Sequence, residues 1–233
     1  MIQIIKSGER HHSDFGWLST YWHFSFDSYH DPKNMQWGAL RVFNDDVVQP
    51  GKGFDRHPHR DMEIVTCVLE GALEHRDTLG NTGVIRPGEV QVMSAGSGIA
   101  HAEYNHSQDD PLHLLQLWIL PRTRGRKPRW EQRQFTADQR AGRLLPVVSS
   151  GTLPDTLTID QDAAIYLSTL RAGQRVEHKS DPARKAYAFV TSGAVTVNDQ
   201  PLAAGDQARI SGEASVRIAA SHDAELILLD LPA

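Results

Sequence analysis

Two short segments of the sequence place metal-binding side chains two residues apart, His57-Pro58-His59 and His101-Ala102-Glu103. On a β-strand, residues i and i+2 point to the same face and lie about 7 Å apart along the backbone. Imidazole and carboxylate groups with this spacing can converge on one ion, at roughly 2.0–2.2 Å from each donor atom. The two pairs therefore predict a metal site of three histidines and one glutamate, formed by His57, His59, His101 and Glu103.

The residues around the two pairs have the pattern of short strands separated by turns. Turn residues recur at 70–71, 77–81, 86–89 and 94–98. Short strands at regular spacing, without an apolar period of 3.6 residues, are typical of an all-β barrel or sandwich. Such a fold can bring the two pairs together. Pro58 has no amide hydrogen for a strand ladder, so we expect the first pair at the start or the edge of a sheet.

Strand alternation predicts which side chains share a face with the ligands. If one strand continues from the first pair, Glu63, Val65 and Cys67 face the same way as His57 and His59. We therefore expect a substrate pocket beside the metal, lined by Val65, Cys67, Val92 and Gln116.

The other histidines of the first half are interpreted as standing outside the ligand set. His75, His106 and His113 are expected to be bystanders, and His113 to pack or hydrogen-bond near the pocket. The aromatic segment Trp22–Tyr29 belongs to an aromatic cluster near the start of the chain. An alternative in which this segment forms a wall or lid over the pocket stays open.

The second half of the sequence weakly repeats the first. Residues 189–197 follow the pattern of residues 67–75, and residues 202–206 follow that of 85–89. Such self-similarity predicts two copies of one barrel. The second copy has lost the metal set, because His178 is the one histidine where the first pair should recur. We predict an N-terminal domain of residues 1–132 that holds the metal and a metal-free C-terminal domain of residues 133–233.

The composition narrows the classes of partner. The chain has 233 residues, a formal net charge of −5 and a single cysteine, Cys67. One cysteine cannot form an internal disulfide, which is typical of a reducing cytoplasm, and no apolar stretch is long enough to span a membrane. An acidic chain is not expected to bind nucleic acid. The basic, proline-containing residues 121–143 are therefore interpreted as a linker that begins a short helix or turn near Thr136.

The residues that carry the metal pattern also resemble a known family. Gly51, His57-x-His59, Glu63 and Gly71 resemble the first cupin motif, and Gly88 with 96–105 resembles the second. The sequences of residues 57–63 and 94–105 are similar to those of the pirin family, and they resemble most closely the bacterial pirin-like quercetin 2,3-dioxygenases. The resemblance covers nearly the whole chain. It implies a bicupin, two double-stranded β-helix barrels in tandem, with a metal site in the N-terminal barrel.

The resemblance also implies chemistry. It assigns His57, His59, His101 and Glu103 as metal ligands and Fe(II) as the expected ion, while Zn, Mn, Ni, Co or Cu suit the same donors. The implied activity is a dioxygenase that opens the heterocycle of a flavonol such as quercetin with O2 and releases CO, with Glu103 or Glu63 as the general base. Two alternatives stay open: a non-enzymatic, metal-binding regulatory protein with a protein partner, and an isomerase or hydrolase that uses the metal as a Lewis acid.

Overall fold

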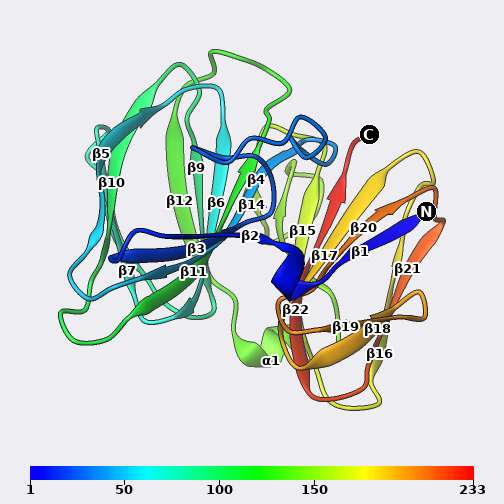
Figure 1. The fold of residues 1–233 in the computed structure, drawn as a ribbon. Coiled ribbons are helices and arrows are strands. Elements are labelled where there is room, and N and C mark those ends of the chain that lie inside the picture. The colour runs from blue at the N-terminus through cyan, green and yellow to red at the C-terminus, as the bar shows by residue number, and fades with distance from the viewer.

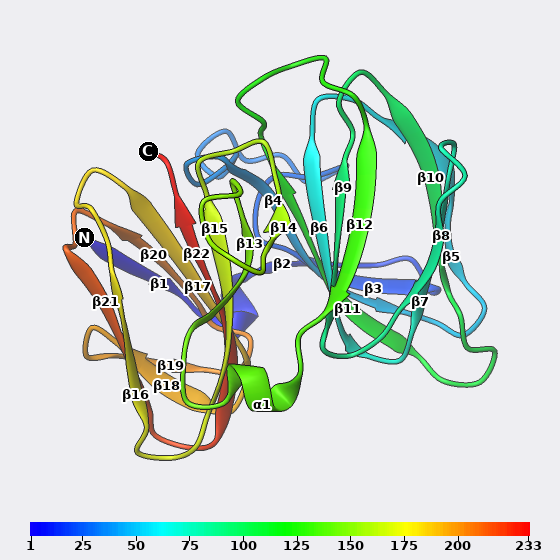
Figure 2. The same cartoon turned by 180° about the vertical axis from the view of Figure 1, so that it is seen from behind.

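The computed structural model describes residues 1–233, which form two β-barrels lying side by side (Figure 1 and Figure 2). Each barrel combines one seven-stranded sheet with one four-stranded sheet. The helical elements are short, η1 (Ser7–Glu9) and α1 (Ala137–Arg140). The predicted all-β fold with two barrels in tandem is confirmed. None of the helices has the length and apolar character needed to span a membrane.

The first barrel contains both predicted metal-binding pairs. Its large sheet has the order β12 (Arg129–Gln134), β9 (Glu89–Ser94), β6 (Glu63–Glu70), β11 (Leu112–Ile119), β4 (Leu40–Val48), β3 (Leu18–Trp22) and β2 (His11–Asp14). Its small sheet has the order β5 (Gly53–His59), β10 (Ile99–Asn105), β7 (Leu73–Asp77) and β8 (Thr82–Ile85). Pro58 lies on β5, an edge strand, as its missing amide hydrogen predicts.

The second barrel repeats this arrangement. Its large sheet has the order β1 (Ile2–Ile5), β20 (Gln207–Ser211), β17 (Lys185–Ser192), β22 (Ala224–Leu231), β15 (Ala164–Leu170), β13 (Leu145–Ser149) and β14 (Leu157–Thr158). Its small sheet has the order β16 (Arg175–Lys179), β21 (Ser215–Ala220), β18 (Ala194–Val197) and β19 (Gln200–Ala203). The N-terminal strand β1 thus belongs to the sheet of the second barrel. The division of the chain after residue 132 stays a proposal.

Matching glycines mark the repeat in the backbone. Gly71 and Gly193 end β6 and β17 with φ angles of 78° and 74°, and Gly88 and Gly205 both have a φ of 84°. A Cβ at Gly71 or Gly193 would also collide with the carbonyl oxygen of Pro111 or Asp223, the residues just before the neighbouring strands β11 and β22 of the large sheets. Only glycine tolerates both conditions without strain. The sequence echo therefore reflects equivalent turns.

The interiors of the two barrels differ. Strand register places Val216 and Ile218 of β21 at the positions that His101 and Glu103 occupy on β10. Both belong to a core of 15 buried apolar residues that fills the second barrel. His178 pairs with Val216 as His57 pairs with His101, and its Nε2 lies 2.7 Å from Asp230 Oδ2. The second barrel is thus packed with hydrocarbon where the first carries imidazole and carboxylate groups.

A shared core of 23 buried apolar residues lies between the two large sheets. Val65 and Cys67 of β6 and Val92 of β9 belong to this core, together with Tyr187 and Phe189 of β17. The prediction that Val65, Cys67 and Val92 line the substrate pocket is therefore wrong. Their side chains were predicted to point into the first barrel, but they point to the opposite face of the large sheet, toward the shared core.

The physical reason is a turn between the first histidine pair and β6. Asp61 has a φ of 51°, and its N–H donates to the carbonyl of Gly96 at 2.9 Å. β5 and β6 are consequently separate strands in different sheets, and the two-residue alternation does not carry through. The expectation that one strand continues from His57 to Cys67 is wrong. Residues 129–134, interpreted as linker, form β12, while α1 confirms the short helix after Thr136.

Gly53 offers a test of how closely β5 must approach β10. A Cβ at this position would lie 2.2 Å from the carbonyl oxygen of Glu103 and 2.5 Å from Cα of Tyr104. We expect Gly53→Ala to push the strands apart and lower the free energy of unfolding by about 1–3 kcal/mol. Thermal denaturation should show a drop of roughly 2–4 °C per kcal/mol. Gly8→Ala is the control, since no atom lies within 4 Å of its Cβ; equal melting temperatures in the two variants would contradict this packing.

Candidate metal centre

Three histidines converge inside the first barrel because two neighbouring strands face each other there. His57 and His59 lie on the inward face of β5, and His101 on β10 is the direct cross-strand partner of His57. The ring centroids are separated by 4.8 Å for His57 and His59, 4.5 Å for His57 and His101, and 4.9 Å for His59 and His101. One nitrogen of each ring lies within 4.8 Å of the others, a spacing suited to a single ion.

The nitrogens of this cluster are arranged as a ligand set. Nε2 of His59 and Nε2 of His101 are buried and have no hydrogen-bond partner. His57 Nδ1 lies 2.7 Å from the carbonyl oxygen of Asp55, which makes Nδ1 the donor and leaves Nε2 with its lone pair. Buried nitrogens without a partner are costly unless something else binds them. These residues therefore fit a divalent transition metal.

Burial also keeps the imidazoles of His59 and His101 neutral. It is the main cause that lowers the pKa of His59 to about 4 and that of His101 to about 3, and the neighbouring histidines lower both further. A metal binds the neutral ring, not the imidazolium. Both lone pairs are thus available at neutral pH without loss of a proton.

Glu103 lies beside the histidines and is held by two carboxamides. Gln116 Nε2 donates to its Oε2 at 2.8 Å, and Gln91 Nε2 lies 3.4 Å from its Oε1. Glu103 Oε1 is 4.0 Å from His101 Nδ1, and the carboxylate groups spatially with His101 and His75. Gln91 is fixed in turn by Trp130 Nε1, which donates to its Oε1 at 2.8 Å. These contacts hold the carboxylate in one orientation inside the barrel.

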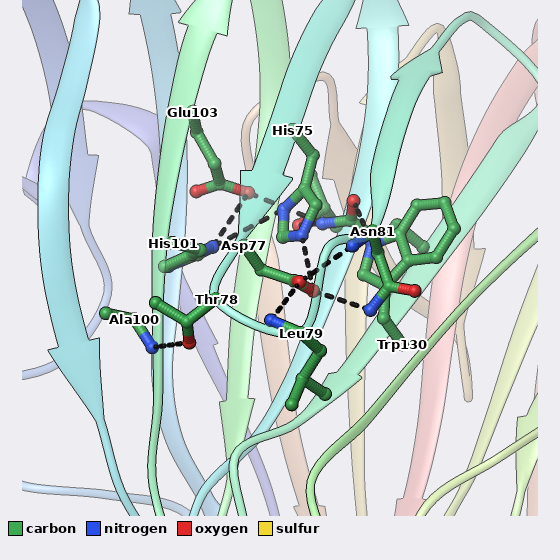
Figure 3. Close-up of polar contacts among 11 residues, drawn as sticks. His75, Asp77, Thr78, Leu79, Asn81, Ala100, His101, Glu103 and Trp130 are labelled. Carbon is green, nitrogen blue, oxygen red and sulfur yellow. Dashed lines mark hydrogen bonds and ion pairs between the residues drawn. The ribbon is translucent and has the colours of Figure 1, made fainter.

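His75 contacts His101, one of the three clustered histidines (Figure 3). Its Nδ1 lies 3.5 Å from His101 Nδ1 and its Nε2 lies 3.3 Å from Asp77 Oδ2, while its ring stacks on Trp130. Burial alone would raise the pKa of Asp77, but hydrogen bonds from Asn81, His75 and the backbone outweigh it and the pKa is lowered. The prediction that His75 is a bystander is wrong. This chain of contacts orients the His101 ring.

An aromatic cavity of about 460 Å³ opens onto the cluster. Its walls include six aromatic side chains, Phe15, Trp17, Trp22, Phe26, Phe54 and Trp118. His57, Glu103 and Gln116 line it too, so of the four residues expected in the pocket only Gln116 is there. Trp22 and Phe26 belong to the aromatic segment near the start of the chain, and this segment forms part of the wall.

Glu63, Asn44 and Asp46 show what the sequence did not reveal. The structure does not bring Glu63 to the histidines: Ser94 Oγ donates to its Oε2 at 2.6 Å, and it lines a different, basic pocket with Arg126. Asn44 and Asp46 of β4, which the sequence analysis missed, line the aromatic cavity. Burial is the main cause that raises the pKa of Asp46 to about 7. The available signal was weak, because the alternation of Asn44 and Asp46 is obscured by Arg41 and Asp45 on the same strand.

Comparison with known proteins assigns this arrangement to a family. Residues 5–119 match the family model described as Pirin, and residues 147–231 match the one described as quercetinase C-terminal cupin domain. The quercetin 2,3-dioxygenase of Escherichia coli (strain K12) is 44% identical over 232 residues, covering 100% of this chain and 99% of that protein. The chain belongs to the pirin family.

Two further pirin relatives agree with this assignment. The pirin-like protein of Caulobacter vibrioides is 46% identical over 219 residues, covering 94% of each chain. The crystal structure of the bacterial pirin YhhW from Escherichia coli in complex with nickel(II) matches with a TM-score of 0.95 at 42% identity, covering 100% of this chain and 99% of that one. The family predicted from the sequence motifs is confirmed.

The low pKa of His101 predicts a pH dependence for the metal-stripped pirin. The unfolded chain takes up a proton near pH 6.5, whereas folded His101 stays neutral down to about pH 3. The free energy of unfolding should therefore be unaffected at pH 8 and fall as the pH drops below 6.5, by up to about 1.4 kcal/mol per pH unit. Melting temperatures between pH 8 and 5 measure this. His101→Gln should show a shallower decline, and identical slopes would contradict the prediction.

Proposed function

We propose that this pirin is a metal-dependent dioxygenase that opens the heterocycle of a flavonol such as quercetin with O2 and releases CO. The observation that carries the proposal is the three-histidine cluster, of which His57 lines an aromatic cavity of about 460 Å³ together with Glu103. Flat aromatic walls suit a flat polyphenol. The names of the curated relatives, quercetin 2,3-dioxygenase among them, support the same substrate class.

The proposed ligands are His57, His59, His101 and Glu103, with Fe(II) as the proposed ion. Zn, Mn, Ni, Co and Cu suit the same nitrogen and oxygen donors, and the nickel(II) complex of the Escherichia coli pirin supports a divalent transition metal in this family. When bound, such an ion polarises a substrate oxygen and lowers the pKa of its hydroxyl.

The chain's own residues would position the substrate and accept its proton. The tryptophan and phenylalanine walls hold the flavonol and exclude water from the reacting centre. Glu103, oriented by Gln116 and Gln91, is the proposed general base for the flavonol hydroxyl. Glu63 is less suited to this role because its carboxylate is engaged by Ser94 outside the cavity. Overall, one flavonol and one O2 give one depside and one CO.

The non-enzymatic alternative has less support. A regulatory protein whose binding to a partner depends on the metal would be expected to hold the metal at a surface that the partner protein can contact. Here His101 is 1% exposed and Glu103 is 2% exposed, while His57 and His59 are half-buried and His57 lines the aromatic cavity. A small aromatic ligand fits this setting better than a protein surface does. The cytoplasmic location stays a proposal.

Oxygen consumption tests the proposed reaction. We expect anaerobic addition of quercetin to the Fe(II)-loaded protein to shift the flavonol spectrum, and admission of O2 to release CO in equal amount. His101→Ala should lower the rate by more than about a hundredfold, because even groups that only orient a ligand are worth 10–100-fold. His106→Ala is the control, since His106 is an exposed residue paired with Glu74. Absence of both the spectral shift and CO would remove the proposal.

Metal affinity tests the role of His75 apart from turnover. His75→Phe keeps an aromatic ring to stack on Trp130 but removes the contacts with His101 and Asp77. We expect the variant to bind the metal about 10–100-fold more weakly, because the His101 ring loses its orienting partner. Competition with a chelator of known affinity gives the value. An affinity equal to that of the wild type and of His106→Ala would show that His75 does not orient the ligand.

A further inference from the structure

Two side chains in the aromatic cavity have polar atoms without a partner. Asn44 and Asp46 of β4 are 4% and 3% exposed, and both line the cavity. The Oδ1 atoms of both residues are buried and accept no hydrogen bond. Thr20 lies directly across from Asp46 on the strand paired with β4, and its hydroxyl partly offsets the burial that raises the pKa of Asp46, but Thr20 Oγ1 makes no hydrogen bond of ordinary geometry. Burying such groups without partners destabilises a fold.

The neighbouring residue shows that partners are available in this part of the chain. Asp45, between them in sequence, points away from the cavity, and Arg10 Nη1 and His113 Nε2 lie 2.7 Å and 2.6 Å from its carboxylate oxygens. These hydrogen bonds outweigh the burial that would raise its pKa, and the pKa of Asp45 is lowered. The polar groups of β4 that face the shared core are thus satisfied. Those that face the cavity are not.

We propose, on the basis of the proposed function, that Asn44 and Asp46 bind a phenolic hydroxyl of the flavonol other than the reacting one. A carboxylate accepts a hydrogen bond from a phenol, and a carboxamide can both donate to the phenol oxygen and accept from its hydrogen. The surrounding tryptophan and phenylalanine side chains contact the ring that carries the hydroxyl. The two residues therefore select polyhydroxylated aromatic ligands over bare ones.

The selection follows from the energetics of unpaired groups. A ligand that supplies the hydroxyl gives a hydrogen-bond partner to polar atoms that the protein leaves unpaired. A ligand without the hydroxyl leaves these atoms buried, with no partner from the ligand or from water. Sites built in this way discriminate strongly against analogues that lack the bonding group. Asn44 also lies across from Gln116 on β11, the side chain that donates to Glu103. Inside the first barrel, Gln116 thus connects the proposed hydroxyl subsite at Asn44 and Asp46 with Glu103 of the proposed metal centre.

Binding of two flavonols that differ in their hydroxyls tests the proposal. Quercetin and 3-hydroxyflavone share the reacting hydroxyl, but 3-hydroxyflavone has no other. We measure both under anaerobic conditions at pH 8, above the pKa of Asp46, with the metal-loaded protein, using fluorescence of Trp17, Trp22 and Trp118 in the cavity wall. We expect the wild type to bind quercetin at least about tenfold more tightly than 3-hydroxyflavone, the size of a hydrogen bond to a charged group.

Substitutions of Asp46 and Asn44 test whether these residues cause the preference for quercetin over 3-hydroxyflavone. Asp46→Leu should abolish it by weakening quercetin binding about tenfold while leaving 3-hydroxyflavone binding within about twofold. Asp46→Asn should retain part of it, and Asn44→Leu should reduce it. Asp109→Asn is the matched control, because it removes the same charge from an exposed residue outside the cavity and should change neither affinity. Melting temperature is the second readout: Asp46→Asn and Asp46→Leu should be more stable than the wild type, since an unpaired buried carboxylate is lost.

The outcomes separate this proposal from the proposed function. An equal loss of affinity for both flavonols in Asp46→Leu, or the absence of a preference in the wild type, overturns the subsite. If the wild type still consumes O2, the proposed function stands. A preference that depends on Asp46, without O2 consumption, supports the subsite and overturns the dioxygenase. Failure of the wild type to bind either flavonol overturns both.

Discussion

The interior of the first barrel is built around imidazole nitrogens that nothing in the protein binds. Nε2 of His59 and Nε2 of His101 are buried and unpartnered, and a β-barrel of this size would be more stable if apolar side chains replaced them. The second barrel shows that alternative, with Val216 and Ile218 of an uninterrupted core at the positions of His101 and Glu103. The same backbone thus serves stability in one copy and binding in the other.

The stabilising packing lies away from the binding residues. The core between the large sheets and the interior of the second barrel contain most of the buried apolar side chains, whereas the first barrel's own interior clusters contain seven and four residues. Polar side chains of Gln91, Gln116 and Thr66 lie between those two small clusters. A binding site that weakens its own barrel can persist because neighbouring packing holds the large sheet in place.

The sequence predicted the parts of this arrangement that depend on local spacing. The i, i+2 histidine pair, the proline on an edge strand and the repeated glycine turns each follow from backbone geometry within a few residues. The side on which β6 faces could not be predicted, because it depends on the left-handed conformation of Asp61 and its contact with Gly96. His75 was missed for a related reason: it reaches His101 only through the pairing of β7 with β10, which no local pattern encodes.

The placement of β1 has a consequence for biosynthesis. Ile2–Ile5 pair with Gln207–Ser211, so β1 finds its partner strand only after all strands of the first barrel have been made. The first barrel can close in the meantime, since its strands lie between residues 11 and 134. Completion of the second barrel therefore joins β1 to β20 across the whole first barrel, and a chain released by the ribosome before β20 is made would keep β1 unpaired, as an exposed strand that quality-control proteases can recognise.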